Sequence, residues 1–303
     1  MNARNHGARI WLVFSLASLA CTSNKMVPAA DSHSGTDHAA PTASTVAAAP
    51  QMPGLPPDAA GALSRLGKSP RHGEWVTIRT GGGDSLRTWV VFPERSTKAP
   101  VVLVVHEVYG LSPWVRSVAD QLAADGFIAI APDLLTMKNL PDGPDSVVTP
   151  LAVAAIRGLD PVWVQRQLDA VAKYGMSLPA AQKRYGIVGF CWGGGVSFAH
   201  AVHAPTLGAS VVYYGASPQK TDLASVRAPV LGLYGGNDAR VDATIPPADS
   251  ALRALGRTYE HNIYASAGHG FLRQQTGTDG ANLAAARAAW PATIAWFRRY
   301  LES

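Results

Sequence analysis

A cysteine stands inside a glycine-rich turn, in the hexapeptide Gly-Phe-Cys-Trp-Gly-Gly at residues 189–194. An apolar run typical of a buried strand precedes this turn and a helical pattern follows it, which is the setting of a nucleophile elbow. Gly189 and Gly193 lack side chains that would collide at so sharp a turn. The amide groups at the start of the helix favour the thiolate form of Cys191. We therefore interpret Cys191 as a nucleophile, and a buried structural cysteine is the alternative.

Two later loops hold partners for such a nucleophile. A carboxylate ends the loop Gly235–Asp238, and a histidine stands in the glycine-containing loop Ala267–Phe271. Catalytic triads on loops that follow strands can have this order along the chain: first the nucleophile, then the acid, then the base. His269 would take the thiol proton or hold it in an ion pair, and Asp238 would orient the imidazole. Either loop alone would be ordinary turn chemistry, whereas all three in this order predict a Cys191–Asp238–His269 triad.

The elements around these loops predict an α/β fold. Continuous apolar runs indicate strands buried on both faces, as in parallel sheets covered by helices. Two earlier β-rich runs joined by residues 81–84 indicate an antiparallel hairpin. The predicted strands are Trp75–Thr80, Leu86–Phe92, Val101–Val105, Phe127–Ala131, Gly186–Phe190, Ser210–Tyr214, Val230–Tyr234 and Tyr259–Tyr264. The predicted helices are 113–125, Leu151–Tyr174, Gly194–His203, Pro247–Leu255 and Asn282–Leu301, the last kinked or divided at Pro291. The prediction is a mostly parallel central sheet flanked by helices.

Residues 71–303 resemble the dienelactone hydrolases (carboxymethylenebutenolidases), which are α/β-hydrolases with a Cys-Asp-His triad. The specific motifs are the three loops above and the segment Val105–Gly110, which reads Val-His-Glu-Val-Tyr-Gly. The resemblance implies that Glu107 contacts the resting cysteine and helps to convert thiol to thiolate when substrate binds; the alternative is a solvent-facing loop glutamate. It also implies that the amides of Trp192 and Val108 form the oxyanion hole. The implied reaction is hydrolysis of a carboxylic ester or lactone through an acyl-enzyme, without cofactor or metal.

The substrate-binding residues match the family only in part. The resemblance implies two arginines that hold a substrate carboxylate, and Arg273 matches the one that lies four residues after the catalytic histidine. The segment Leu135–Asn139 contains no arginine where the second is expected. Lys138 would replace it or be a surface lysine, and an ammonium lacks the bidentate fork of a guanidinium. Tyr109 would border the site. We expect a small ester or lactone substrate, anionic if these residues hold a carboxylate.

The N-terminus has the pattern of an export signal. Arg4 and Arg9 precede an apolar stretch that is too short for a comfortable membrane-spanning helix, and small residues follow it. Cys21 closes a sequence similar to a lipobox, so it would be lipidated and anchor the chain to a membrane, or be removed with the signal. We predict a signal peptide at 1–21, a flexible Ala/Pro-rich linker at 22–70 and the hydrolase domain at 71–303. The expected location is the periplasm or cell envelope.

Composition excludes several other classes of protein. Hydrophobic residues make up 47% of the 303-residue chain, which argues against wholesale disorder. The formal charge of +5 is scattered rather than clustered, so we expect no nucleic-acid partner. Two cysteines provide no disulfide framework. Two other functions stay open: an envelope-tethered binding protein that kept the fold but lost efficient turnover, and a redox role for Cys191.

Overall fold

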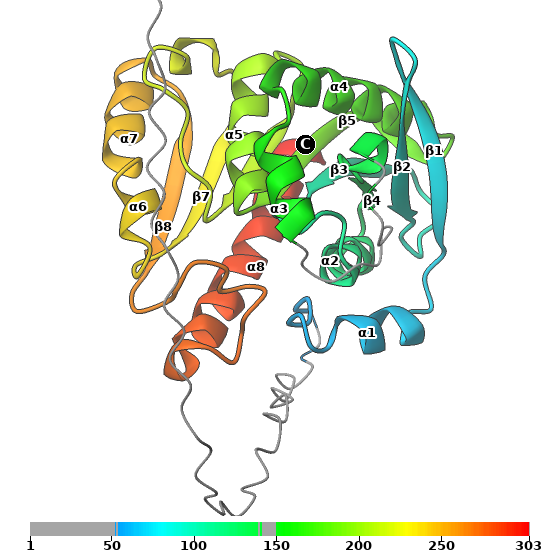
Figure 1. Cartoon of the computed structure of the whole chain (residues 1–303), viewed down its shortest axis with the longest axis horizontal. Coiled ribbons are helices and arrows are strands. Elements are labelled where there is room, and N and C mark those ends of the chain that lie inside the picture. Colours follow the sequence, from blue (N-terminus) through cyan, green and yellow to red (C-terminus); the bar gives the residue numbers. More distant parts are fainter. Residues whose placement is uncertain (1–51, 53, 139, 141–149, 303) are drawn as a thin grey trace, which may run out of the picture. The chain divides into compact units, whose positions relative to one another are not determined.

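A single eight-stranded sheet runs through the domain, in the order β1-β2-β4-β3-β5-β6-β7-β8 (Figure 1). This computed structural model describes residues 52, 54–138, 140 and 150–302. The strands are β1 (Gly73–Gly81), β2 (Asp84–Val91), β3 (Ala99–Val105), β4 (Ile128–Pro132), β5 (Ala181–Phe190), β6 (Ala209–Tyr213), β7 (Val230–Gly235) and β8 (Tyr259–Tyr264). β1 and β2 form the predicted antiparallel hairpin, β2 runs antiparallel to β4, and all other neighbours are parallel. The α/β class with a mostly parallel sheet is therefore confirmed.

Helices cover both faces of this sheet. They are α1 (Ala62–Lys68), α2 (Pro113–Ala124), α3 (Pro150–Arg157), α4 (Pro161–Ser177), α5 (Trp192–His203), α6 (Ala239–Asp242), α7 (Ile245–Ala254) and α8 (Ala281–Leu301), with short 3-10 turns η1 (Thr136–Lys138), η3 (Leu223–Ser225) and η4 (Thr278–Gly280). The single helix predicted over 151–174 is wrong, because α3 ends before Gly158 and a new helix begins at Pro161. Asp160 caps that new helix by accepting a hydrogen bond from the Val162 amide at 3.0 Å.

The last helix is not divided at its proline. α8 continues through Pro291, where we predicted a kink or a division. Pro291 lies on the solvent-exposed side of α8, whereas its neighbour Trp290 is buried. Packing of the buried face therefore keeps the helix in one piece despite the missing amide.

The sheet separates two hydrophobic cores. Along β3, Val102 and Val104 belong to a core shared with α2 and α8, and Leu103 and Val105 belong to a core shared with α4, α5 and α7. Successive side chains of a strand point to opposite faces, so an uninterrupted run of valine and leucine fills both cores. The strands at the centre are thereby fixed in position, and so are the loops that leave their carboxyl ends.

The folded part begins before the predicted boundary at residue 70. Leu55 and Ala62 are buried, and α1 lies within the segment that we predicted as linker. The carbonyl groups of Pro56 and Pro57 accept hydrogen bonds from side chains of the domain, and Arg65 pairs with a buried aspartate. Specific polar contacts thus order a segment whose composition is poor in large apolar residues.

Several predictions concern residues outside the described part of the chain. The signal peptide at 1–21, Cys21 and most of the linker lie there. Among the described residues, no helix is both long and apolar enough to cross a membrane.

Candidate active site

The predicted nucleophile occupies a strained turn between β5 and α5. Cys191 has φ 56° and ψ −117°, a conformation that side-chain-bearing residues rarely adopt. A Cβ atom at Gly189 would lie 1.8 Å from the Gly193 carbonyl oxygen, and one at Gly193 would lie 2.4 Å from the His106 carbonyl oxygen. Both glycines are therefore required by the close approach of backbone to backbone. The turn has the geometry expected of a nucleophile elbow.

The predicted acid and base form a hydrogen-bonded pair. Asp238 follows β7 and His269 follows β8, and their Oδ2 and Nδ1 atoms lie 2.5 Å apart. Asp238 is buried, while the His269 side chain is about one third exposed. The carboxylate thus fixes the ring with Nδ1–H as donor and leaves Nε2 free to exchange a proton. In the described structure, no hydrogen bond joins His269 to Cys191, so the thiol and the imidazole are separate in this state.

The environment of Cys191 holds its sulfur as a thiol. Burial, followed by the nearby Glu107 carboxylate, raises the pKa of Cys191 to about 11. Hydrogen bonds from the amides of Trp192 and Val108, together with the charge of Arg240, lower it. The Trp192 amide at the helix start therefore favours the thiolate, as expected from the sequence, but burial and a neighbouring negative charge outweigh it.

Glu107 lies inside the site rather than in solvent. Glu107 stands in the loop that follows β3, and its side chain is only 5% exposed. Its Oε2 atom lies 3.2 Å from Nε of Arg273. Burial raises the pKa of Glu107 to about 7, although Arg273 lowers it. A carboxyl group with such a pKa can exist in either protonation state near neutral pH.

A buried histidine holds the loop that carries Glu107. The Nδ1–H group of His106 donates to the Glu107 carbonyl at 2.8 Å, and its Nε2 accepts from the Leu134 amide at 3.2 Å. Its ring stacks on Trp192 with the centroids 5.7 Å apart. Burial lowers the pKa of His106, so it is neutral and can make one donor and one acceptor contact. His106 thus fixes both sides of the predicted oxyanion hole, a role that no sequence motif indicated.

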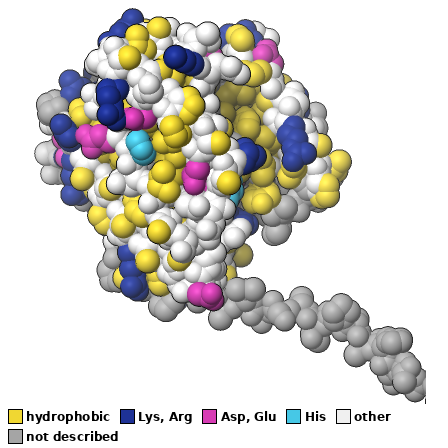
Figure 2. All heavy atoms as spheres, turned by 90° about the vertical axis from the view of Figure 1, so that its left-hand side faces the viewer, with side chains coloured by type: hydrophobic (Ala, Val, Ile, Leu, Met, Phe, Trp, Pro, Cys, Tyr) yellow, Lys and Arg dark blue, Asp and Glu magenta, His cyan; other side chains and the backbone are white. Residues whose placement is uncertain are grey.

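A cavity of about 620 Å³ opens beside Cys191. Its wall is formed by Val108, Arg157, Leu159, Pro161, Val164, Gln165, Cys191, Trp192, Gly195, Val196, Ala199, Tyr214, Ala216 and Arg240. Figure 2 shows a hollow on the molecular surface in which hydrophobic side chains gather and beside which basic side chains lie. Such a combination suits a small organic substrate with an apolar body.

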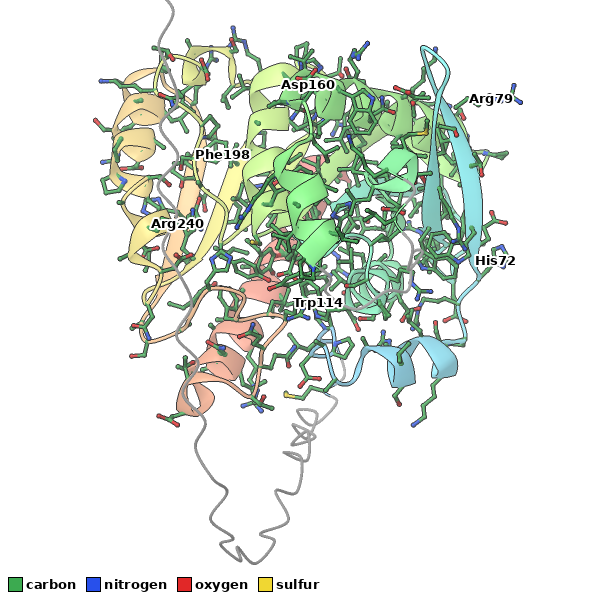
Figure 3. All side chains as sticks on the ribbon, viewed as in Figure 1. His72, Arg79, Trp114, Asp160, Phe198 and Arg240 are labelled. Carbon is green, nitrogen blue, oxygen red and sulfur yellow. The ribbon has the colours of Figure 1, made fainter. Side chains whose placement is uncertain are left out.

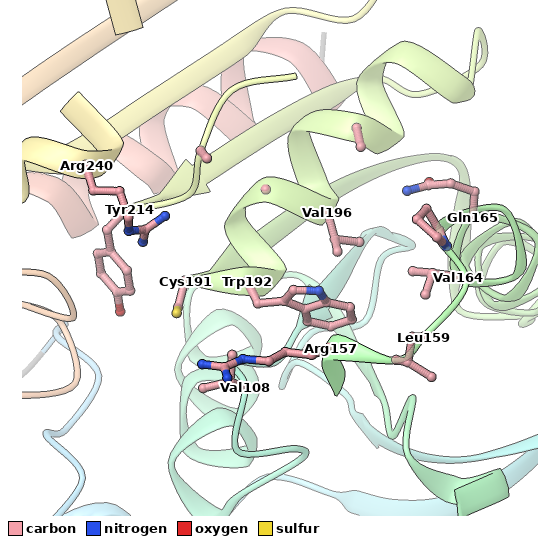
Figure 4. A pocket seen from close by; sticks show the side chains of 14 residues that line it. Val108, Arg157, Leu159, Val164, Gln165, Cys191, Trp192, Val196, Tyr214 and Arg240 are labelled. Carbon is pink, nitrogen blue, oxygen red and sulfur yellow. The ribbon is translucent and has the colours of Figure 1, made fainter. Parts of the chain in front are cut away.

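Two arginines that the sequence analysis did not single out lie close to Cys191. Arg157 stands at the end of α3 and Arg240 near the start of α6, and Figure 4 shows both side chains at the Cys191 end of the cavity. Figure 3 locates Arg240 within the whole domain. Neither guanidinium has a hydrogen-bond or ion-pair partner among the described residues. Arg240 lies two residues after the predicted acid, which is the only sequence signal that could have drawn attention to either.

The predicted substrate-binding residues lie elsewhere. Arg273 pairs with Glu107 and lies over the Tyr109 ring, with its Cζ 4.8 Å from the centroid, so both residues border the site behind Glu107. Lys138 is exposed at the end of η1, and it is not among the residues of the cavity wall. Among the described residues, no group of three or more His, Cys, Asp or Glu side chains could hold a metal ion.

A tyrosine beside the predicted catalytic groups was not identified by the sequence analysis. Tyr214 follows β6 directly with φ 39°, is fully buried, and its ring centroid lies 5.1 Å from that of His269. Its hydroxyl has no hydrogen-bond partner in the described structure. Burial and the nearby Glu107 and Cys191 raise its pKa well above the ordinary value, so it stays a phenol. It can therefore donate a hydrogen bond into the site.

Comparison with known proteins agrees with this fold. The sequence model of the Dienelactone hydrolase family matches residues 86–301. A Salmonella typhimurium protein with the name "Putative carboxymethylenebutenolidase" is 32% identical over 237 residues, covering 74% of this chain and 87% of its own. The crystal structure of a "Putative Dienelactone Hydrolase" from Klebsiella pneumoniae has a TM-score of 0.68 at 28% identity and covers 76% of this chain and 99% of its own. A dienelactone hydrolase from Anabaena variabilis has a TM-score of 0.60 at 25% identity, with coverages of 76% and 99%.

Proposed function

The chain belongs to the dienelactone hydrolase family, and on this premise we propose that it hydrolyses a carboxylic ester or lactone with Cys191 as nucleophile. The observation that carries the proposal is the convergence of three groups at the carboxyl ends of parallel strands. Cys191 sits on a strained turn after β5, and the hydrogen-bonded pair of Asp238 and His269 follows β7 and β8. These groups have the roles of nucleophile, orienting acid and base.

The reaction starts from a protonated thiol. With a pKa of about 11, only about one Cys191 in a thousand is a thiolate at pH 8. Nε2 of His269 therefore takes the proton from Sγ as the sulfur attacks the acyl carbon and a carbon–sulfur bond forms. The amides of Trp192 and Val108, which already approach the sulfur, are placed to donate to the oxygen that becomes negative.

Collapse of this tetrahedral species completes acylation. The Nε2–H group gives its proton to the leaving oxygen, and the carbon–oxygen bond of the ester breaks. Water then attacks the thioester while Nε2 of His269 takes its proton, the carbon–sulfur bond breaks, Sγ regains the proton from Nε2–H, and the acid product leaves. Cys191 and His269 follow strands of one sheet, but no hydrogen bond joins them in the described structure, so proton transfer requires the thiol and the imidazole to approach.

We also propose that the preferred substrate carries a negative charge near the scissile bond. Arg157 and Arg240 reach the Cys191 end of the cavity without described partners, so a carboxylate bound there would gain charge-assisted hydrogen bonds. These two arginines would take the place of the second arginine that the segment 135–139 lacks.

Hydrolysis of p-nitrophenyl butyrate by the full chain tests the catalytic proposal. We expect Cys191→Ala and His269→Ala to lose at least about a thousandfold in kcat/KM. His203→Ala is the matched control, since His203 also pairs with an aspartate, Asp169, at 2.7 Å but does so on the surface. Full activity of Cys191→Ala on an ester that the parent cleaves would refute the proposal. Loss of activity in the control as well would show that His–Asp pairs act through stability.

A further inference from the structure

A glutamine side chain stands at the end of the cavity opposite the nucleophile. Gln165 belongs to α4 and lines the same cavity as Cys191, yet it is only 9% exposed. Figure 4 shows Trp192 and Val196 between the two residues, with Gln165 reaching from α4 toward α5. The cavity therefore has an apolar middle and a polar group at each end.

Buried hydrogen bonds fix the direction in which this amide points. Oε1 of Gln165 lies 2.7 Å from Nδ1 of His200, and Nε2 of His200 lies 3.1 Å from the hydroxyl of Tyr185. Burial lowers the pKa of His200 to about 4 and raises that of Tyr185 to about 12, so both are neutral. A neutral imidazole has one donor and one acceptor nitrogen.

The amide oxygen of Gln165 settles which nitrogen of His200 is the donor. Oε1 can only accept, so the hydrogen of the neutral ring lies on Nδ1, and Nε2 is the acceptor. The buried Tyr185 proton then has His200 Nε2 as its described acceptor, and a buried donor without an acceptor is costly. It follows that Nδ1–H of His200 donates to Oε1 of Gln165.

With Oε1 occupied in this way, the Nε2 group of Gln165 has no partner among the described residues and faces the cavity. We propose that Gln165 is a substrate-recognition residue, and that its amide donates a hydrogen bond to a neutral oxygen acceptor at the far end of the bound ester. His200 and Tyr185 are positioning residues that hold the donor in place. This inference rests on the proposed function, because it concerns the substrate of the same site.

The lining defines the class of substrate. The cationic side chains of the cavity wall, Arg157 and Arg240, lie at the Cys191 end, so the distal end favours a neutral acceptor over a carboxylate. Between the ends, Leu159, Trp192 and Val196 offer apolar contact. The fitting substrate is thus an ester with an apolar spacer that ends in a ketone or amide carbonyl.

Binding to the Cys191→Ala chain tests this assignment without requiring turnover. The probes are phenyl esters of oxo-acids and oxoalkyl esters of benzoic acid, with the keto group placed successively farther from the ester. Each is compared by calorimetry with its isostere in which C=CH₂ replaces C=O. We expect one spacer length to give about tenfold tighter binding of the ketone than of its isostere.

The same comparison is repeated in two further variants of this chain. Gln165→Leu should reduce the ketone-to-isostere ratio to about one. Gln167→Leu is the matched control, because Gln167 is a buried glutamine of the same helix that contacts Asp84 instead of the cavity, and it should keep the preference. A second variant, Gln165→Glu, keeps an acceptor for His200 and should also lose the preference at pH 8.

Absence of any preference at every spacer length, or a preference that persists in both Gln165 variants, would overturn the assignment. Because the ratio compares two ligands within one variant, a general change in stability cancels. If the parent chain hydrolyses no ester while the preference is still found, the catalytic proposal fails and the recognition site stands.

Discussion

At the scale of single residues, the site is organised around the protonation of one sulfur atom. Burial and the Glu107 carboxylate keep Cys191 a thiol, whereas two amides and Arg240 favour the thiolate. Glu107 is itself poised, because burial raises its pKa to about 7 while Arg273 opposes this. A ligand that neutralises or moves Glu107 would therefore favour the thiolate, which restricts the reactive form to the occupied site.

The first prediction concerns Glu107→Gln. Removing a negative charge beside the thiol lowers the Cys191 pKa, so the thiolate fraction at a given pH rises. We expect the rate of alkylation by iodoacetamide at pH 8 to increase roughly tenfold. The pH at which half of Cys191 is a thiolate should also shift downward. The ultraviolet absorbance of the thiolate measures this shift.

Glu74→Gln is the control for this measurement. Glu74 lies on β1, partly exposed and close to His72, and its charge is not among the causes of the Cys191 pKa described above. An unchanged alkylation profile in Glu107→Gln would show that burial alone sets the thiol pKa.

At the scale of elements, one buried aspartate attaches α1 to α2. Asp120 of α2 accepts from Arg65 of α1 at 2.6 Å and from Arg71 at 2.8 and 2.9 Å, and its side chain is 3% exposed. These hydrogen bonds outweigh burial and hold the pKa of Asp120 below its ordinary value of 3.8. The cluster therefore stabilises the folded state at pH values above 3.8. This stabilisation is lost as the pH falls through the lower pKa that Asp120 has in the folded state.

The second prediction is that Asp120→Ala lowers the free energy of unfolding by about 3 kcal/mol at pH 7, because it leaves two arginines without their buried partner. Urea denaturation measures this change, and hydrogen exchange in α1 should become faster. Asp249→Ala, which breaks a surface pair with Arg253, is the matched control and should cost less than about 0.5 kcal/mol. Equal effects of the two variants would show that α1 is not held by this cluster.

At the scale of the whole molecule, the mostly parallel sheet gathers residues that are far apart in the chain. Glu107, Cys191, Tyr214, Asp238 and His269 each follow a different strand. The carboxyl ends of parallel strands meet at one edge, where ligand sites of such sheets are found. The cores on both faces hold the strands in register, so the site inherits its rigidity from packing rather than from its own contacts.

The third prediction compares two truncations. Deleting residues 1–51 should leave kcat/KM within about twofold, since every described group of the site lies beyond them. Deleting residues 1–70 should lower the melting temperature by about 10 °C, because Trp114 loses the Pro57 carbonyl and Asp120 loses Arg65. Thermal unfolding followed by circular dichroism distinguishes the two chains. Equal melting temperatures would restore residue 70 as the start of the folded domain.

The sequence alone determined the fold class and the strand positions, and it indicated the three residues that we propose as a triad. Apolar runs mark buried strands because both faces of a parallel sheet exclude water, and glycines mark the elbow because only they fit the turn. The sequence also indicated Cys191, Asp238 and His269 as candidates for catalysis, because each of them follows a recognisable strand. Local rules missed the break between α3 and α4 and the start of the folded chain, and of the kink or division expected at Pro291 the division is absent.

Only the tertiary structure decided the electrostatics and the shape of the site. The pairing of Glu107 with Arg273, and the convergence of Arg157 and Arg240 on one cavity, depend on helices and loops that no local pattern relates. The sequence could favour a thiolate from the helix start, but the protonation of Cys191 follows from burial and a neighbouring charge. Burial and the distance between charges are properties of the packed molecule, because they exist only after the elements have been brought together.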